Sequence, residues 1–136
     1  MRRRFALILF ATFLSDVCQA AEMSGSFLGA WLIDRIDGLK PAGTRAVTMQ
    51  VASDGQIAGQ GPCNGYGARF HLSDQRVVFT RGMTTRMFCG QEAMQQEQRF
   101  LSMFQDGATW RVTGADLSLE SDGGVKIHAT RLEQSR

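Results

Sequence analysis

Two short stretches, GPCNGY at residues 61–66 and TTRMFC at residues 84–89, decide how this chain is expected to fold. Each contains one cysteine, Cys63 or Cys89, and a stretch with helical periodicity follows the second. The remaining cysteine, Cys18, lies in an N-terminal leader. If the leader is removed on export, Cys63 and Cys89 are the two cysteines left, and an oxidising compartment favours a disulfide between them.

The leader has the layout of a secretory signal peptide. Three arginines at 2–4 precede an apolar run at 5–14, and Cys18-Gln19-Ala20 places small residues where signal peptidases require them. We therefore predict cleavage after Ala20 and a periplasmic or secreted protein. The apolar run is shorter than the ~20 residues that a transmembrane helix needs.

A lipoprotein acylated at Cys18 is the alternative interpretation of this leader. The residues before it, SDV at 15–17, disfavour it, because an acidic residue and a branched valine stand where small neutral residues are expected. We therefore expect no lipid anchor.

Export also changes the charge of the protein. The full chain has 15 basic and 13 acidic residues, a net charge of +2. Removing the three arginines and one aspartate of the leader leaves 12 of each, so the mature chain is neutral. A neutral chain gives no support for nucleic-acid binding or for a basic membrane-surface patch.

The mature chain is long enough for one domain, which we place at residues 27–132. Residues 21–26 form a flexible lead-in and residues 133–136 a polar tail. Most of the domain alternates between apolar and polar residues, which is typical of strands buried on one face. Expected strands lie near 31–33, 47–51, 56–60, 68–72, 76–79, 110–112, 117–119 and 125–130, and residues 122–124 (DGG) predict a hairpin between the last two.

One segment has helical instead of two-residue periodicity. Between Gly90 and Gln105, four apolar residues fall on one stripe, and Asp106-Gly107 is a helix-stop signal. We therefore expect an α+β, mostly β fold. Seven to eight strands form a small curved antiparallel sheet or open barrel, and one helix packs on it.

At this point the sequence resembles the META domain family of HslJ-like bacterial proteins. Five motifs in order carry the resemblance, over about residues 27–131: WLI at 31–33, DGQIAG at 54–59 leading into CNGY at 63–66, TRMFC at 85–89, EQRFL at 97–101 and GADLSL at 114–119. The resemblance implies a compact, mostly antiparallel β fold with one helix in envelope-associated or secreted proteins. It also implies links to heat shock and envelope stress, without an established catalytic activity.

The cysteines admit three interpretations. We expect a structural disulfide between Cys63 and Cys89, which are 26 residues apart and would close a loop worth roughly 3–4 kcal/mol. A reactive thiol is the functional alternative, because Cys89 stands at a helix N-terminus, which lowers a thiol pKa. Two unpaired cysteines are the third.

Glu97 is the most unusual residue of the helix, because it falls in the middle of the apolar stripe. A buried carboxylate is costly unless it is paired. Candidate partners in or near the cysteine motifs are Arg81, Thr84, Thr85, Arg86, Asn64 and Tyr66. We interpret Glu97, with Asn64, Tyr66, Thr85 and Arg86, as a structural anchor, and a ligand-binding or acid–base role as the alternative.

Other residues are interpreted as structural. Asn64-Gly65 is a tight-turn signal, since both residue types tolerate positive φ. His71 and His128 have no metal-ligand spacing and are expected to be solvated strand residues. The arginines at 69, 76, 81 and 86 are taken as outward strand positions, with an anionic partner as the alternative. The methionines at 83, 87, 94 and 103 suit either core filling or an adaptable binding groove.

The sequence contains no serine-hydrolase motif, phosphate loop or paired metal ligands. We therefore expect a non-enzymatic periplasmic or envelope protein, a monomer without cofactor or metal, that supports stress tolerance by binding or stabilising another component. That partner is an envelope protein or a small ligand. The alternative is a small secreted inhibitor or a carrier of an apolar ligand.

Overall fold

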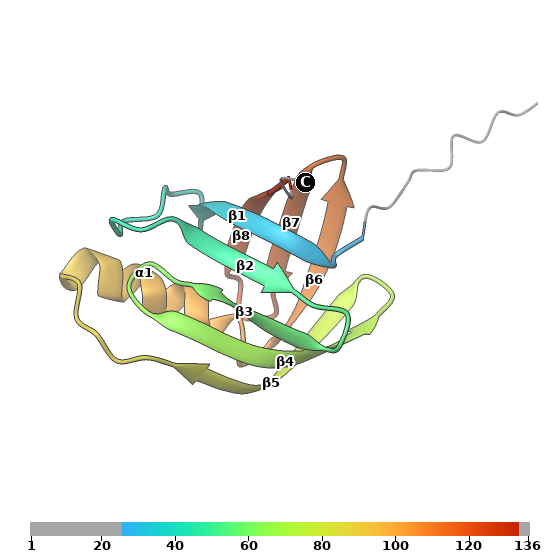
Figure 1. The fold of residues 1–136 in the computed structure, drawn as a ribbon, viewed down its shortest axis with the longest axis horizontal. Helices are drawn as coiled ribbons and strands as arrows, with labels where there is room; N and C mark the ends of the chain where they lie inside the picture. Colours follow the sequence, from blue (N-terminus) through green and yellow to red (C-terminus); the bar gives the residue numbers. More distant parts are fainter. Residues whose placement is uncertain (1–25, 134–136) are drawn as a thin grey trace, which may run out of the picture.

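The computed structural model describes residues 26–133 as an eight-stranded barrel with one helix (Figure 1). The predicted signal peptide, Cys18 and residues 134–136 lie outside the described residues. In chain order the elements are β1 (Gly29–Ile36), β2 (Val47–Val51), β3 (Gln56–Gln60), β4 (Gly65–Ser73), β5 (Arg76–Thr84), α1 (Gln91–Ser102), β6 (Gly107–Thr113), β7 (Asp116–Ser121) and β8 (Lys126–Arg131). The mostly β fold with one helix is confirmed.

The sheet closes on itself, whereas the sequence predicted a small curved sheet or an open barrel. Each strand pairs antiparallel with the next, and β8 pairs with β1, with Trp31 opposite Arg131 and Ile33 opposite Ala129. The predicted hairpin joins β7 and β8. There the Gly124 N–H donates to the Ser121 carbonyl (2.9 Å), and Gly124 has a φ of 86°, which glycine adopts without steric cost.

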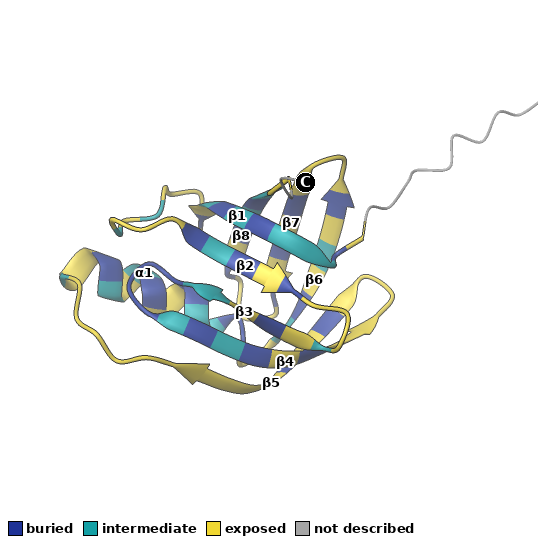
Figure 2. Ribbon diagram, viewed as in Figure 1, coloured by how far each residue is buried: buried dark blue, intermediate teal, exposed yellow. Residues whose placement is uncertain are grey.

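Side chains fill the interior of the barrel. Inward and outward residues alternate along the strands, so buried and exposed bands alternate along the ribbon in Figure 2. Trp31, fully buried, donates its indole N–H to the Phe27 carbonyl (2.9 Å), and the Arg131 guanidinium lies 4.1 Å from its ring centre.

The helix is shorter than predicted. It runs from Gln91 to Ser102 rather than to Gln105, and the next residues make three-residue turns in which Phe104 N–H donates to the Leu101 carbonyl (3.1 Å). The tighter turns accompany the burial of Met103 and Phe104 in the core, and Gly107 begins β6 instead of ending a helix. Within residues 26–133 no helix is long and apolar enough to cross a bilayer.

The C-terminal part of α1 packs under the β4–β5 hairpin. Phe100 lies edge-on to Tyr66 with ring centres 5.1 Å apart, and Phe104 is 5.0 Å from Tyr66 and 4.9 Å from Phe79. This aromatic cluster fixes one side of the helix to the barrel. The opposite side of the helix remains exposed.

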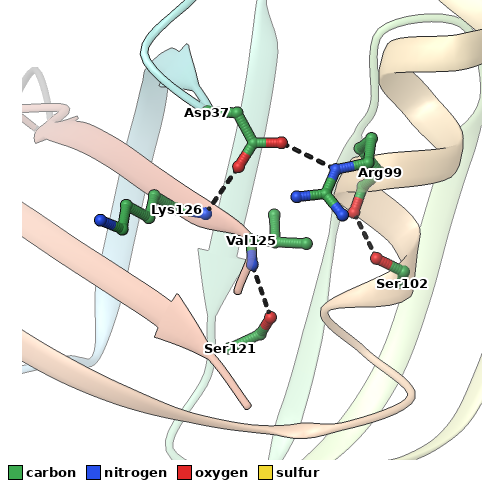
Figure 3. A network of polar contacts seen from close by, with 6 residues as sticks. All are labelled: Asp37, Arg99, Ser102, Ser121, Val125 and Lys126. Atoms are coloured by element: carbon green, nitrogen blue, oxygen red, sulfur yellow. Dashed lines mark hydrogen bonds and ion pairs between the residues drawn. The ribbon is translucent and has the colours of Figure 1, made fainter. Parts of the chain in front are cut away.

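A polar network fixes α1 to the ends of β1 and β8 (Figure 3). Arg99 Nε donates to Asp37 Oδ2 (2.8 Å), while Asp37 Oδ1 accepts from the Lys126 amide (2.9 Å). Burial alone would raise the pKa of Asp37. The hydrogen bonds and positive charges of Arg99 and Lys126 outweigh it and lower the pKa below its usual value.

Candidate binding site between the disulfide and the helix

Cys63 and Cys89 form a disulfide, as predicted. Their Cα atoms are 5.6 Å apart, and the bond joins the residues before β4 to the residues before α1. Cys63 is buried and Cys89 is exposed, so the bond runs from the core to the surface. Because the bond anchors the segment before the helix to the barrel, it holds the surroundings of both motifs together.

Glu97 lies beneath this disulfide, with 3% of the residue exposed. Its Oε1 accepts hydrogen bonds from the backbone N–H groups of Cys63 (2.9 Å) and Asn64 (2.5 Å), and its Oε2 accepts one from the Asn64 side chain (2.6 Å). No cation pairs with it in the described part of the chain. Three donors from the two residues before β4 therefore satisfy the carboxylate, in place of the arginine partners that the sequence offered.

Gly61 makes this approach of helix and loop possible. A Cβ atom at position 61 would lie 2.9 Å from Glu97 Oε1 and 3.0 Å from the Asn64 carbonyl oxygen. Real Cβ contacts are essentially never shorter than 3.0 Å, so any side chain here would displace the carboxylate. The GPCN stretch thus fits around Glu97 because it starts with glycine.

Asn64 connects the helix, the start of β4 and the segment after β5. Its amide donates to Glu97, as above, and to the Met87 carbonyl (3.3 Å), while its Oδ1 accepts from the Thr85 hydroxyl (2.9 Å) and the Met87 N–H (2.6 Å). The predicted turn is present, since residues 61–64 connect the antiparallel strands β3 and β4 and the Gly61 N–H donates to the Asn64 carbonyl (2.7 Å), but neither Asn64 nor Gly65 has positive φ. The side chain, rather than the backbone conformation, gives asparagine its role here.

The structure brings together only part of the predicted anchor. Thr85 contacts Asn64, which in turn contacts Glu97, and the Thr85 backbone N–H donates to the Gly65 carbonyl (3.0 Å). Tyr66 faces the core instead, where its hydroxyl donates to the Thr48 carbonyl (2.8 Å) and burial raises the pKa of its phenol. Arg86 is exposed on the surface and does not contact Glu97.

A groove lies above the Asn64–Glu97 pair, which we call the β5–α1 groove. Its volume is about 550 Å³, and it adjoins a hollow of about 240 Å³ that shares Thr84 and Leu101 with it. One wall is residues 84–88, the other is the helix face of Gln91, Met94, Gln95, Gln98 and Leu101, and Asn64 and Glu97 lie at the bottom. The groove thus separates the segment after β5 from the helix.

Large apolar side chains stand exposed on the β5 side of this groove. Met83 is 76% exposed, Phe88 79% and Met87 45%, while Met103 is buried in the core. The two interpretations of the methionines therefore apply to different residues. Phe88 and the helix glutamines line the groove but were not among the predicted site residues. The sequence marked the glutamines only as residues outside the apolar stripe of the helix, which indicates exposure and not a binding role.

The histidines do not share one environment. His71 is exposed, and His128 lies on β8 with 41% of its side chain exposed, but the sequence did not indicate that it stands beside two carboxylates. His128 Nδ1 lies 2.6 Å from Asp34 Oδ1 and its Nε2 lies 3.5 Å from Asp116 Oδ1, on the outer side of the barrel. Strand pairing places β1 and β7 on either side of β8, which the spacing along the sequence could not indicate. Among residues 26–133, no group of three or more His, Cys, Asp or Glu side chains is arranged so that it could hold a metal ion.

A comparison of the sequence with models of known protein families gives a match over the whole barrel. The model of the META domain matches residues 26–134. The chain belongs to the META domain family. This match covers every element of the barrel and the helix, including both cysteine motifs and Glu97.

Solved structures share the fold of this META domain. One is described as the NMR structure of a protein from Burkholderia xenovorans. It is 21% identical with a TM-score of 0.62, over 78% of this chain and 83% of that one. A second NMR structure of a protein is 16% identical with a TM-score of 0.63, over 75% and 88% of the two chains. At these identities the likeness concerns the fold alone. No curated protein significantly matches the sequence.

Proposed function

We propose that this META domain protein is a non-enzymatic binding protein of the bacterial periplasm or envelope. It supports stress tolerance by holding or stabilising another component. The β5–α1 groove carries this proposal, because it combines exposed apolar side chains with a rigid support. Exposed apolar side chains beside a groove with a polar rim are typical of an interaction site.

The support of the groove is unusually well fixed for a surface loop. The disulfide anchors residue 89, the Asn64 side chain holds Thr85 and Met87, and Glu97 holds Asn64 from below. A segment held in this way loses little conformational entropy when a partner binds. The arrangement therefore favours binding through a preformed surface.

The polar groups at the bottom of the groove do not favour catalysis. All hydrogen bonds of the Glu97 carboxylate go to neighbouring backbone and amide groups, and the residue is almost fully buried. A general acid or base must reach a substrate atom within hydrogen-bond distance. The disulfide removes both thiols of the described residues from nucleophilic chemistry.

The compartment in this proposal rests on the predicted signal peptide and on the disulfide. Disulfides form and persist in oxidising compartments such as the bacterial periplasm. We therefore expect the mature protein to be exported and to carry no free thiol.

A cross-linking experiment in the periplasm tests the proposed function. A photo-reactive amino acid at position 88 reports on the groove, and the same substitution at Thr109, exposed on β6, is the matched control. We expect a defined cross-linked partner from position 88 alone, and reduced heat or antibiotic tolerance in a deletion strain. Unchanged tolerance together with equal cross-linking from both positions would contradict the proposal.

A further inference from the structure

One edge of β5 lacks a strand partner over half of its length. On one side β5 pairs with β4 as far as Thr84 opposite Tyr66. On the other side its pairing with β6 ends at Val78 opposite Gly107. From Phe79 onward, no strand in the described part of the chain pairs with this second edge. An unpaired edge presents a row of N–H and C=O groups that another strand can complete.

Beyond the end of β5, the chain still forms hydrogen bonds on the β4 side and leaves its other edge unpaired by any of the described residues. The N–H of Thr85 donates to the Gly65 carbonyl, and the N–H of Met87 donates to Asn64 Oδ1. The residues between and after them, Arg86 and Phe88, make no backbone hydrogen bond to any of residues 26–133. In an antiparallel pair, alternate residues of a strand form backbone hydrogen bonds to one neighbour. The N–H and C=O groups of the residues between them point to the opposite side, where a second strand can bond to them.

The helix face across the groove supplies the matching second wall. Met94 and Leu101 are partly buried apolar residues, and Gln91, Gln95 and Gln98 are exposed side-chain amides. Glutamine amides both donate and accept hydrogen bonds, so they can bond to a peptide backbone. The groove thus offers strand-like pairing on one side and mixed apolar and amide contacts on the other.

Charge indicates what kind of peptide fits. Arg86 lines the groove and Arg81 precedes it on β5, and both are exposed. The ion pairs of the described residues involve Arg76, Arg99 and His128, and neither of these two arginines. A carboxylate on a partner would therefore meet a guanidinium that is free to pair with it.

We propose that the β5–α1 groove binds an extended peptide segment of another protein by β-strand addition. The segment has apolar side chains at alternate positions and an acidic residue beside them. Its backbone pairs with Arg86 and Phe88, its alternate apolar side chains contact Met83 and Met87, and its carboxylate pairs with Arg86. This inference rests on the proposed binding function and deepens it by naming the class of partner. Strand addition of this kind takes its affinity from main-chain hydrogen bonds and its specificity from alternate side chains.

A labelled synthetic peptide tests the proposal on the exported protein with its disulfide intact. The peptide is short and blocked, with valines alternating with threonines and a glutamate at each end, and binding is followed by fluorescence anisotropy. We expect N-methylation of alternate backbone nitrogens to weaken binding about fivefold or more, since each blocked nitrogen loses a hydrogen bond. Replacing its glutamates by lysines should weaken binding by a similar factor.

Protein variants locate the site. Arg86→Glu should weaken binding at least about fivefold at low salt, whereas Arg111→Glu, the same change at an exposed position of β6, should leave it unchanged. The peptide should also slow amide hydrogen exchange at Arg86 and Phe88, which a contact through side chains alone would not do. Equal effects of the two variants, or protection elsewhere without protection here, would overturn the inference.

The remaining outcomes separate this inference from the proposed function. If no peptide binds but position 88 still cross-links a folded partner, strand addition is wrong and the binding function stands. If the protein dimerises with rising concentration and protects the same amides without peptide, a second copy occupies the edge and the inference is overturned. If neither peptide nor cross-linked partner is found, both proposals fail.

Discussion

Replacing Glu97 by glutamine tests the polar connection between the helix and the cysteine motifs. The substitution removes the charge and changes the shape of the side chain little. Its carbonyl oxygen can still accept from the amides of Cys63 and Asn64, but its new amide meets the Asn64 amide across a contact of 2.6 Å. Two donors then face each other in a buried site, and the remaining hydrogen bonds are accepted by a neutral oxygen instead of a charged one.

The expected cost follows from these contacts. A hydrogen bond to a charged group contributes about 1.5–3 kcal/mol, and a buried donor left without an acceptor costs about 1–3 kcal/mol. We expect Glu97→Gln to lower the free energy of unfolding by ~2–4 kcal/mol, a large part of the total stability of a small domain.

Urea unfolding with the disulfide intact, followed by tryptophan fluorescence, measures this effect. Glu92→Gln is the matched control, because Glu92 is exposed in the first turn of the same helix and should cost only ~0.3–1 kcal/mol. Combining Glu97→Gln with Asn64→Asp reverses donor and acceptor across the short contact and should recover part of the loss. A Glu97→Gln cost no larger than that of Glu92→Gln, or additive effects in the double variant, would refute the reasoning.

Three further predictions concern other parts of the molecule. Reducing the Cys63–Cys89 disulfide should lower the free energy of unfolding by roughly 3–4 kcal/mol, measured by urea unfolding with and without reductant; an unchanged midpoint would count against its structural role. Asp37→Asn should cost at most ~1 kcal/mol near neutral pH, because its ion pair with Arg99 is partly exposed. Since the folded-state pKa of Asp37 is lowered, its contribution is present above the ordinary carboxyl pKa and is lost on acidification, so the stabilities of variant and wild type should converge below about pH 4; a constant difference would refute this. Tyr66 is the single tyrosine, and burial raises its pKa, so tyrosinate absorbance should rise only as the barrel unfolds above about pH 10; ordinary ionisation in the folded protein would contradict it.

Much of the barrel could be predicted because its strands are buried on one face. Alternation of apolar and polar residues located strands near their observed positions, and the DGG turn gave the β7–β8 hairpin. The end of the helix was harder, since Met103 and Phe104 continue the apolar pattern while the backbone has already left the α-helix. Buried apolar residues are expected here both in a longer helix and in the turns that follow it, so periodicity could not tell where the helix ends.

The candidate site could be predicted only in part, because long-range geometry decides it. The position of Glu97 in the apolar stripe marked it as buried, but its partners are mainly backbone N–H groups, which every residue possesses. The free edge of β5 depends on where β6 leaves it, and no residue type at Val78 indicates that point. Exposed Phe88 lay within a recognised motif, yet its exposure follows from the disulfide and the fold around it.

The closing strand pair also constrains the order in which the protein can fold. Trp31 in β1 lies opposite Arg131 in β8, so the seam joins residues a hundred positions apart in the chain. Contacts of such long range are entropically expensive to form early and make folding slow. The Cys63–Cys89 loop is far shorter and can be locked by oxidation before β8 is available. An export pathway that delivers the chain from its N-terminus would thus let the disulfide-bonded β4–α1 half become ordered first and leave barrel closure as the final step.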